Sequence, residues 1–153
     1  MKELWLCTRQ YPKGRGEAFL QHALPVWKKQ FSRVVVIPMF DGEGEFPVPD
    51  GIEVMHLWKD DEFTPLSNYA TFANAPAVLR TVSRYGDREG RSRRYVLSLS
   101  RQLVRKAEVF RTLLGKNYDP EKVAVLSVWL EDWVTVLGLV KEREPRFRFS
   151  AMG

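Results

Sequence analysis

Short apolar runs alternate along the chain with stretches whose apolar residues recur at helical spacing. Residues 4–8, 34–38 and 123–128 are apolar at almost every position, which is typical of strands buried on both faces of a parallel sheet. In segment 52–57 apolar and polar residues alternate, which predicts a further strand, and the last strand begins at Phe147. The pattern therefore distributes strands along the whole chain.

Between these runs, apolar residues at steps of three and four predict amphipathic helices. The first helix begins at Glu17, and its apolar face consists of Phe19, Leu20, Ala23, Leu24, Trp27 and Phe31. Pro25 lies within this pattern and should kink the helix or split it into two turns. The longest helix is expected over 93–114, with Gly115 as its C-terminal cap, and shorter helices over 75–85 and 132–141.

The order of these elements predicts an α/β fold with a mainly parallel sheet, because short crossovers favour parallel pairing and right-handed connections. A chain of 153 residues can bury a core and is expected to form one domain, residues 1–153. Apolar residues make up 44% of the chain and charged residues 28%, as in ordinary globular proteins. No stretch is long and apolar enough to span a membrane, so we expect a cytoplasmic protein.

Basic residues are unevenly placed. The formal net charge is +5, and the segment from Arg80 to Arg111 carries a large share of the arginines. This segment would be either a solvated helix face with a basic loop, or a surface that attracts a polyanion or the inner face of an anionic membrane. No zinc-finger spacing or aromatic ribonucleoprotein motif accompanies it, so specific nucleic-acid binding is not expected.

Three segments that follow predicted strands could meet where ligands bind in doubly wound α/β folds, beyond the carboxyl ends of the strands. The first segment is 11–17, which contains Tyr11, Lys13, Gly14, Arg15, Gly16 and Glu17. Its glycines would let the backbone approach a ligand, and its N–H groups and basic residues favour an anion. The alternative is a tight turn that carries two exposed basic residues.

The second segment leaves the strand at 123–128 and contains Trp129, Glu131, Asp132 and Trp133. Carboxylates can hold sugar hydroxyls, and the face of an indole packs well on a pyranose. Alternatively, the acids complement a helix N-terminus and the tryptophans belong to the core. The third segment is the end of the chain, with Met152 and Gly153.

A complete catalytic set is missing from the sequence. His22 and His56 lie far apart along the chain, and Cys7 lies inside a predicted strand, where a buried and unreactive thiol is expected. A metal site is therefore not expected, and neither is a bound cofactor.

Taken together, these segments resemble motifs of bacterial glycosyltransferases with the GT-B fold, in the large retaining family four. Residues 11–20 resemble the family motif FPYGKGETFL, residues 128–133 resemble YWLxDW, and residues 149–153 resemble FISRAHG. Residues 24–25 and 31–38 also match, and the matches occur in the right order along the chain.

The resemblance implies a Rossmann-like three-layer domain that forms one half of a GT-B fold and recognises the acceptor. The loop 13–17 would then face the donor diphosphate across the cleft to a second, donor-binding domain. Tyr11, the segment 129–133 and the chain end would line the acceptor side. Met152 stands where the family usually has a histidine near the transferred sugar, and methionine cannot donate a hydrogen bond there.

The leading hypothesis is therefore the acceptor-recognition domain of an enzyme that moves a sugar from a nucleotide sugar to a polysaccharide or lipid-linked acceptor. Because the chain ends where a strand would pass into a loop, we expect a fragment of a longer protein, inactive alone, whose partner is its own C-terminal domain. The alternatives are a non-catalytic α/β binding or regulatory module, and a protein that binds polyanions or a membrane surface through Arg80 to Arg111.

Overall fold

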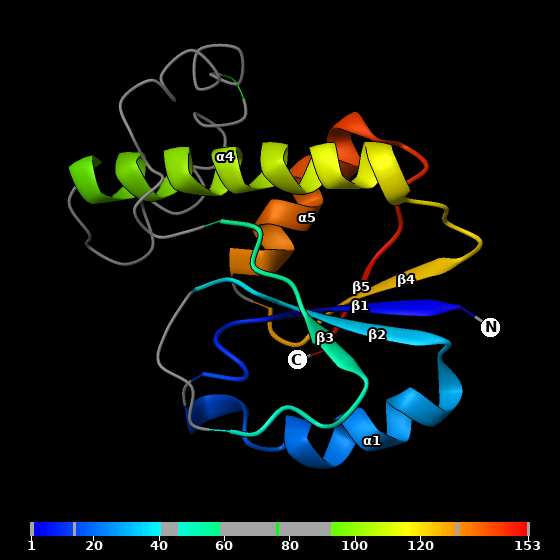
Figure 1. Cartoon of the computed structure of the whole chain (residues 1–153). Helices are drawn as coiled ribbons and strands as arrows, with labels where there is room; N and C mark the ends of the chain where they lie inside the picture. The colour runs from blue at the N-terminus through cyan, green and yellow to red at the C-terminus, as the bar shows by residue number, and fades with distance from the viewer. Residues whose placement is uncertain are drawn as a thin grey trace.

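A computed structural model describes residues 2–13, 15–40, 46–58, 76, 93–130 and 132–152. Within these residues, all strands pair in parallel in one sheet with the order β3-β2-β1-β4-β5 (Figure 1). The strands are β1 (Glu3–Thr8), β2 (Arg33–Pro38), β3 (Ile52–Val54), β4 (Val123–Ser127) and β5 (Ser150–Ala151). The strand order reverses between β1 and β4, as in a Rossmann-like sheet.

Helices cover both faces of the sheet and complete a three-layer α/β domain. Figure 1 shows α4 (Arg93–Asn117) and α5 (Asp132–Arg143) together on one face, and α1 (Leu20–Gln30) on the other. A short 3₁₀ helix, η1 (Arg15–Glu17), connects the loop after β1 to α1. The predicted α/β fold with a parallel sheet is thus confirmed.

The apolar runs of β1 and β2 are explained by burial on both sides. Alternate residues of a strand point to opposite faces, and the two strands divide accordingly between two clusters. Trp5, Cys7, Val35 and Ile37 pack in the core beneath α4 and α5. Leu4, Leu6, Val34 and Val36 pack in the core with Leu20 and Leu24 of α1.

Two helices differ from their predictions: α1 is not split into two turns at Pro25, and α4 does not end at Gly115. The helix α1 runs without interruption through Pro25, whose ring is exposed while Leu20 and Leu24 anchor the neighbouring turns in the core. The helix α4 continues past Gly115 to Asn117, and the N–H of Tyr118 still donates to Leu114 O at 2.7 Å. Beyond Gly115, Tyr118 packs against the core and the Phe147 ring, and this contact favours continuing the helix against the helix-breaking tendency of glycine, which is only about 1 kcal/mol.

Some element boundaries also differ. Strand β3 ends at Val54 rather than 57, although Met55 N still donates to Val36 O at 2.8 Å. Strand β5 begins at Ser150, because Phe147 is instead buried in a cluster of aromatic rings with Phe110 and Tyr118. The helix predicted over 75–85 falls outside the described residues, apart from Pro76, which is helical.

Candidate functional site at the carboxyl edge of the sheet

The segments that leave the strands are held side by side at the carboxyl edge of the sheet. Met39 N donates to Thr8 O at 2.8 Å, Val128 N to Cys7 O at 3.0 Å, and Met152 N to Ser127 O at 2.9 Å. The loops after β1 and β4 therefore meet where the strand order reverses. This is the place at which open α/β sheets bind ligands.

Glu17 joins these two loops. Its side chain turns back from η1 beneath the loop after β1, and the residue is only 3% exposed. Oε1 accepts hydrogen bonds from Arg9 N at 2.8 Å and from the indole Nε1 of Trp129 at 3.0 Å. Oε2 accepts from Gln10 N at 2.8 Å and Tyr11 N at 2.7 Å. One carboxylate thus fixes three consecutive backbone amides and a side chain from the far side of the switch point.

Tyr11 supports the same loop from the interior rather than lining an open cleft. Its ring is fully buried, stacks on Phe46, and donates a hydrogen bond from its hydroxyl to Pro47 O at 3.4 Å. Burial raises the pKa of the Tyr11 phenol, which keeps the hydroxyl protonated as a donor. The hydroxyl of Thr8 donates to Tyr11 O at 3.2 Å and closes the turn.

The two tryptophans after β4 have different environments. Trp133 is 3% exposed, packs against Trp58 and Phe110, and donates its indole N–H to Thr8 O at 2.7 Å. Trp129 is 37% exposed, and its ring meets that of Phe19 edge-on at 6.0 Å between centroids. Trp133 is therefore a core residue, as the alternative interpretation held, and Trp129 presents an aromatic surface to solvent.

A shallow depression lies beside Trp129, over the ends of β1, β2 and β4. Its lining residues are Arg9, Met39, Phe40, Trp129, Asp132 and Trp133. Arg9 and Asp132 bring a cationic and an acidic group to a wall that is otherwise aromatic and apolar. Such a mixture of apolar walls and a few polar groups is typical of small-molecule sites.

The remaining predicted site residues are only partly brought together. Gly16 is exposed, and a Cβ built on it would meet no atom within 4 Å. Lys13 is half-buried in the same loop, and Arg15 is described through its backbone alone, in η1. Met152 is half-buried against the core on the α1 side of the sheet. Gly14, Glu131 and Gly153 lie outside the described residues.

Phe19 was expected on the buried face of the first helix, but it is 44% exposed. It precedes α1 and packs against Trp129 instead, because η1 ends just before it and the regular helix begins only at Leu20. Its exposed ring therefore adds to the aromatic surface at this edge.

Lys106 was expected to contribute to a basic surface, but the structure buries it to 4% exposure. Its ammonium donates to Met39 O at 2.9 Å and lies 4.6 Å from the centre of the Phe40 ring and 4.9 Å from that of Trp58. Trp58 Nε1 donates to the same carbonyl at 2.7 Å. The spacing of Lys106 from Leu103 and Phe110 placed it on the apolar face of α4, and this was the signal available in the sequence.

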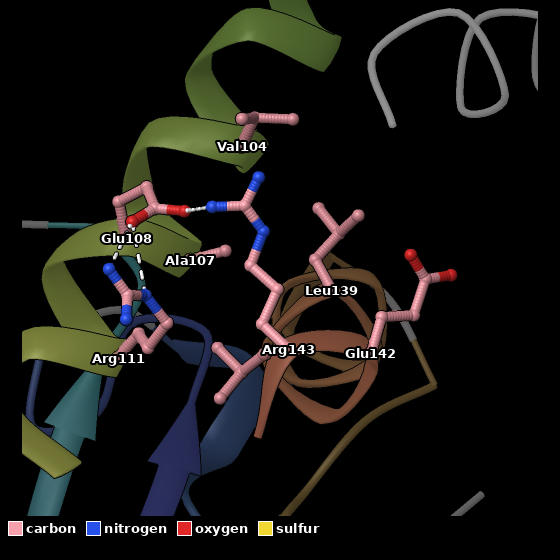
Figure 2. Close-up of a pocket in the computed structure, with 8 residues that line it drawn as sticks. Val104, Ala107, Glu108, Arg111, Leu139, Glu142 and Arg143 are labelled. Atoms are coloured by element: carbon pink, nitrogen blue, oxygen red, sulfur yellow. Dashed lines mark hydrogen bonds and ion pairs between the residues drawn. The ribbon is translucent and has the colours of Figure 1, made fainter. Parts of the chain in front are cut away.

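A second hollow lies in the seam between α4 and α5 (Figure 2). Figure 2 shows Glu108 between Arg111 and Arg143, with ion pairs to both. Arg111 also contacts Glu144 at 3.4 Å. Glu108, and secondarily Glu144, raise the pKa of the Arg111 guanidinium, which therefore stays charged. These charges join the two helices, so we assign this hollow to packing rather than to ligand binding.

The described residues contain neither a metal site nor a membrane-spanning helix. No group of three or more His, Cys, Asp or Glu in this part of the chain could hold a metal ion. None of its helices has both the length and the apolar character needed to cross a membrane. Comparison of the chain with models of protein families, with curated proteins and with solved structures gives no match.

Proposed function

We propose that this chain is the acceptor-recognition domain of a glycosyltransferase, which binds a sugar at the carboxyl edge of its sheet. The supporting observation is that Trp129, which is 37% exposed, lines a shallow depression together with Asp132 and Arg9, at the switch point of a parallel sheet. In the full reaction, a nucleotide sugar would donate its sugar to a polysaccharide or lipid-linked acceptor.

The chemistry of the three side chains suits a sugar. An indole offers a large, rigid apolar face on which the C–H side of a pyranose can lie. The Asp132 carboxylate would accept hydrogen bonds from sugar hydroxyls, and the Arg9 guanidinium would donate hydrogen bonds to ring or hydroxyl oxygens. The depression is shallow and open to solvent, so a sugar would lie on the Trp129 side of this edge rather than enter a deep cavity.

In this proposal, a second α/β domain would hold most of the nucleotide sugar and face the loop 13–17 across a cleft. The 153-residue chain alone should then bind nucleotide sugars weakly and catalyse no transfer. Incubation with radiolabelled UDP-glucose, UDP-galactose or GDP-mannose and glycan acceptors tests this prediction. Turnover by the isolated chain would contradict the assignment of this chain as the acceptor side alone.

Saturation-transfer NMR would test sugar binding directly. The probes are methyl glucoside, methyl galactoside, methyl mannoside and N-acetylglucosamine, each titrated against the 153-residue chain. We expect at least one sugar to receive saturation, and Trp129→Ala to abolish it. Val26→Ala is the matched control, because Val26 is an apolar residue, 52% exposed, on α1. Absence of any signal, or an undiminished signal from Trp129→Ala, would refute the proposal.

A further inference from the structure

We propose that Glu17 is the positioning residue of this edge: its carboxylate is an internal anion that fills an amide nest and orients the Trp129 ring. The link from ring orientation to sugar binding rests on the function proposed above. The hydrogen bonds of Glu17 are by themselves enough to show that it fixes the loop after β1 and the Trp129 indole.

The first observation is the convergence of three consecutive backbone amides on one carboxylate. The N–H groups of Arg9, Gln10 and Tyr11 all donate to Glu17, at 2.7 to 2.8 Å. Successive amides that point to one spot form an anion-binding nest, the arrangement that loops use to hold phosphate. Here the chain supplies its own anion, so these amides are not available to a donor diphosphate.

The second observation is that the same carboxylate reaches across the switch point. Oε1 accepts from Arg9 N in the loop after β1 and from Trp129 Nε1 in the loop after β4. Ser127 Oγ donates to Trp129 O at 2.8 Å, which fixes the backbone of that residue, and Phe19 meets the ring edge-on. With its backbone, its N–H and one ring contact all fixed, the Trp129 indole has little freedom to turn.

Because Glu17 is buried, only another carboxylate is expected to replace its side chain in the amide nest. Its oxygens are held by four N–H donors, and a buried carboxylate needs such donors to compensate for lost hydration. Removal of the carboxylate leaves the donors around an empty nest. A small external carboxylate of the right size should then occupy the nest and restore the orientation of Trp129.

The indole N–H resonance of Trp129 reports this directly in ¹⁵N-tryptophan-labelled protein, with Trp129→Phe to assign the peak. We expect Glu17→Gln and Glu17→Ala to shift the peak upfield and to speed its hydrogen exchange. Addition of sodium acetate or formate to Glu17→Ala should move the peak back toward its wild-type position, and sodium chloride at equal ionic strength should not. An unmoved peak in Glu17→Gln, or no response of a folded Glu17→Ala to either carboxylate, would overturn the inference.

Val34→Ala serves as the destabilised control, because Val34 is buried at the opposite end of the sheet. Val34→Ala should lower the stability of the protein without moving the Trp129 peak. If Val34→Ala instead shifts the peak as much as Glu17→Gln does, the peak reports general destabilisation and the inference is overturned. Should Glu17→Ala fail to fold, the peak position in Glu17→Gln decides alone.

Sugar titration separates this inference from the proposed function. If a methyl glycoside binds the wild type, Glu17→Gln should weaken its binding roughly fivefold, the effect of one lost hydrogen bond. Equal binding by the two proteins would refute the role of Glu17 in presenting Trp129 to the sugar. If no glycoside binds the wild type, the proposed function fails, while the indole shift and the carboxylate rescue still decide whether Glu17 is the positioning residue.

Discussion

Replacing Glu17 by glutamine should destabilise the protein by an amount that follows from its hydrogen bonds. Glutamine keeps the shape of glutamate but offers one acceptor oxygen instead of two. Each carboxylate oxygen of Glu17 accepts two N–H groups. Whichever way the new amide turns, two donors therefore lose their acceptor, either those of Arg9 and Trp129 or those of Gln10 and Tyr11.

The smaller loss decides which way the amide turns. Arg9 and Trp129 are exposed residues and Tyr11 is fully buried, so the N–H groups of Arg9 and Trp129 are the easier ones to rehydrate. The glutamine oxygen should then face Gln10 and Tyr11, leaving Arg9 and Trp129 without their acceptor. A hydrogen bond to a charged group contributes about 1.5 to 3 kcal/mol. With partial rehydration of Trp129, we expect a loss of about 3 kcal/mol in the free energy of unfolding.

Urea unfolding followed by circular dichroism measures this loss. For a slope of about 2 kcal/mol per molar urea, the midpoint should fall by about 1.5 M. Glu121→Gln is the control, because it makes the same change of charge at an exposed carboxylate and should stay within about 0.5 kcal/mol of wild type.

A double-mutant cycle with Trp129→Phe tests the assumed orientation of the amide. Phenylalanine keeps an aromatic ring but has no N–H, so part of the loss caused by Glu17→Gln should already be present in that background. The two changes should therefore be coupled by about 1 kcal/mol. The reasoning is refuted if Glu17→Gln alone costs less than about 0.5 kcal/mol, the range of ordinary surface changes.

Three further predictions concern other parts of the fold. Gly115→Ala should stabilise the protein by about 0.5 to 1 kcal/mol in thermal or urea unfolding, because Gly115 lies inside α4 and an added Cβ would meet nothing. A loss of stability there would contradict the helix boundary. Trp133→Phe should cost about 1 to 3 kcal/mol, because it removes the indole donor to Thr8 O from a packed cluster. Burial raises the pKa of the Cys7 thiol, so dithionitrobenzoate should react with it only after unfolding. Since the unfolded thiol releases its proton near pH 8.5 and the native one does not, the Cys7 contribution to stability should decline as pH rises above that value. Rapid labelling of native Cys7 would contradict its burial.

The layers of the fold could be predicted from the sequence, because a strand that is buried on both faces appears as a continuous run of apolar residues. The runs that became β1, β2 and β4 needed only local apolar patterning to be recognised. The ends of the helices and strands were harder to predict from the sequence. Gly115 has the local signature of a helix stop, but α4 continues to Asn117, and Tyr118 beyond it packs against the core. Such tertiary packing is not visible in a local window of sequence.

The sequence predicted where the candidate site lies in the fold, but not the roles of its individual residues. Topology alone predicts that the loops after β1 and β4 meet, and Glu17 and Trp129 do so. The sequence could not assign different roles to Trp129 and Trp133, because both follow the same strand and only their neighbours distinguish them. Glu17 likewise resembled one of several charges facing a ligand, until the fold brought three amides from the preceding loop around it.

The central place of β1 in the sheet has a consequence for how the chain folds. Its register pairs Glu3 with Arg33 on one side and with Val123 on the other. Pairing β1 with β4 closes a loop about four times as long as pairing β1 with β2. Four times the length is two doublings, which together cost roughly 1.2 kcal/mol more in chain entropy. Glu17 lies within the shorter loop, and Trp129 lies just beyond the longer one. The bond between them can therefore form only when the distant halves of the chain have joined, so its presence reports completed assembly rather than local order.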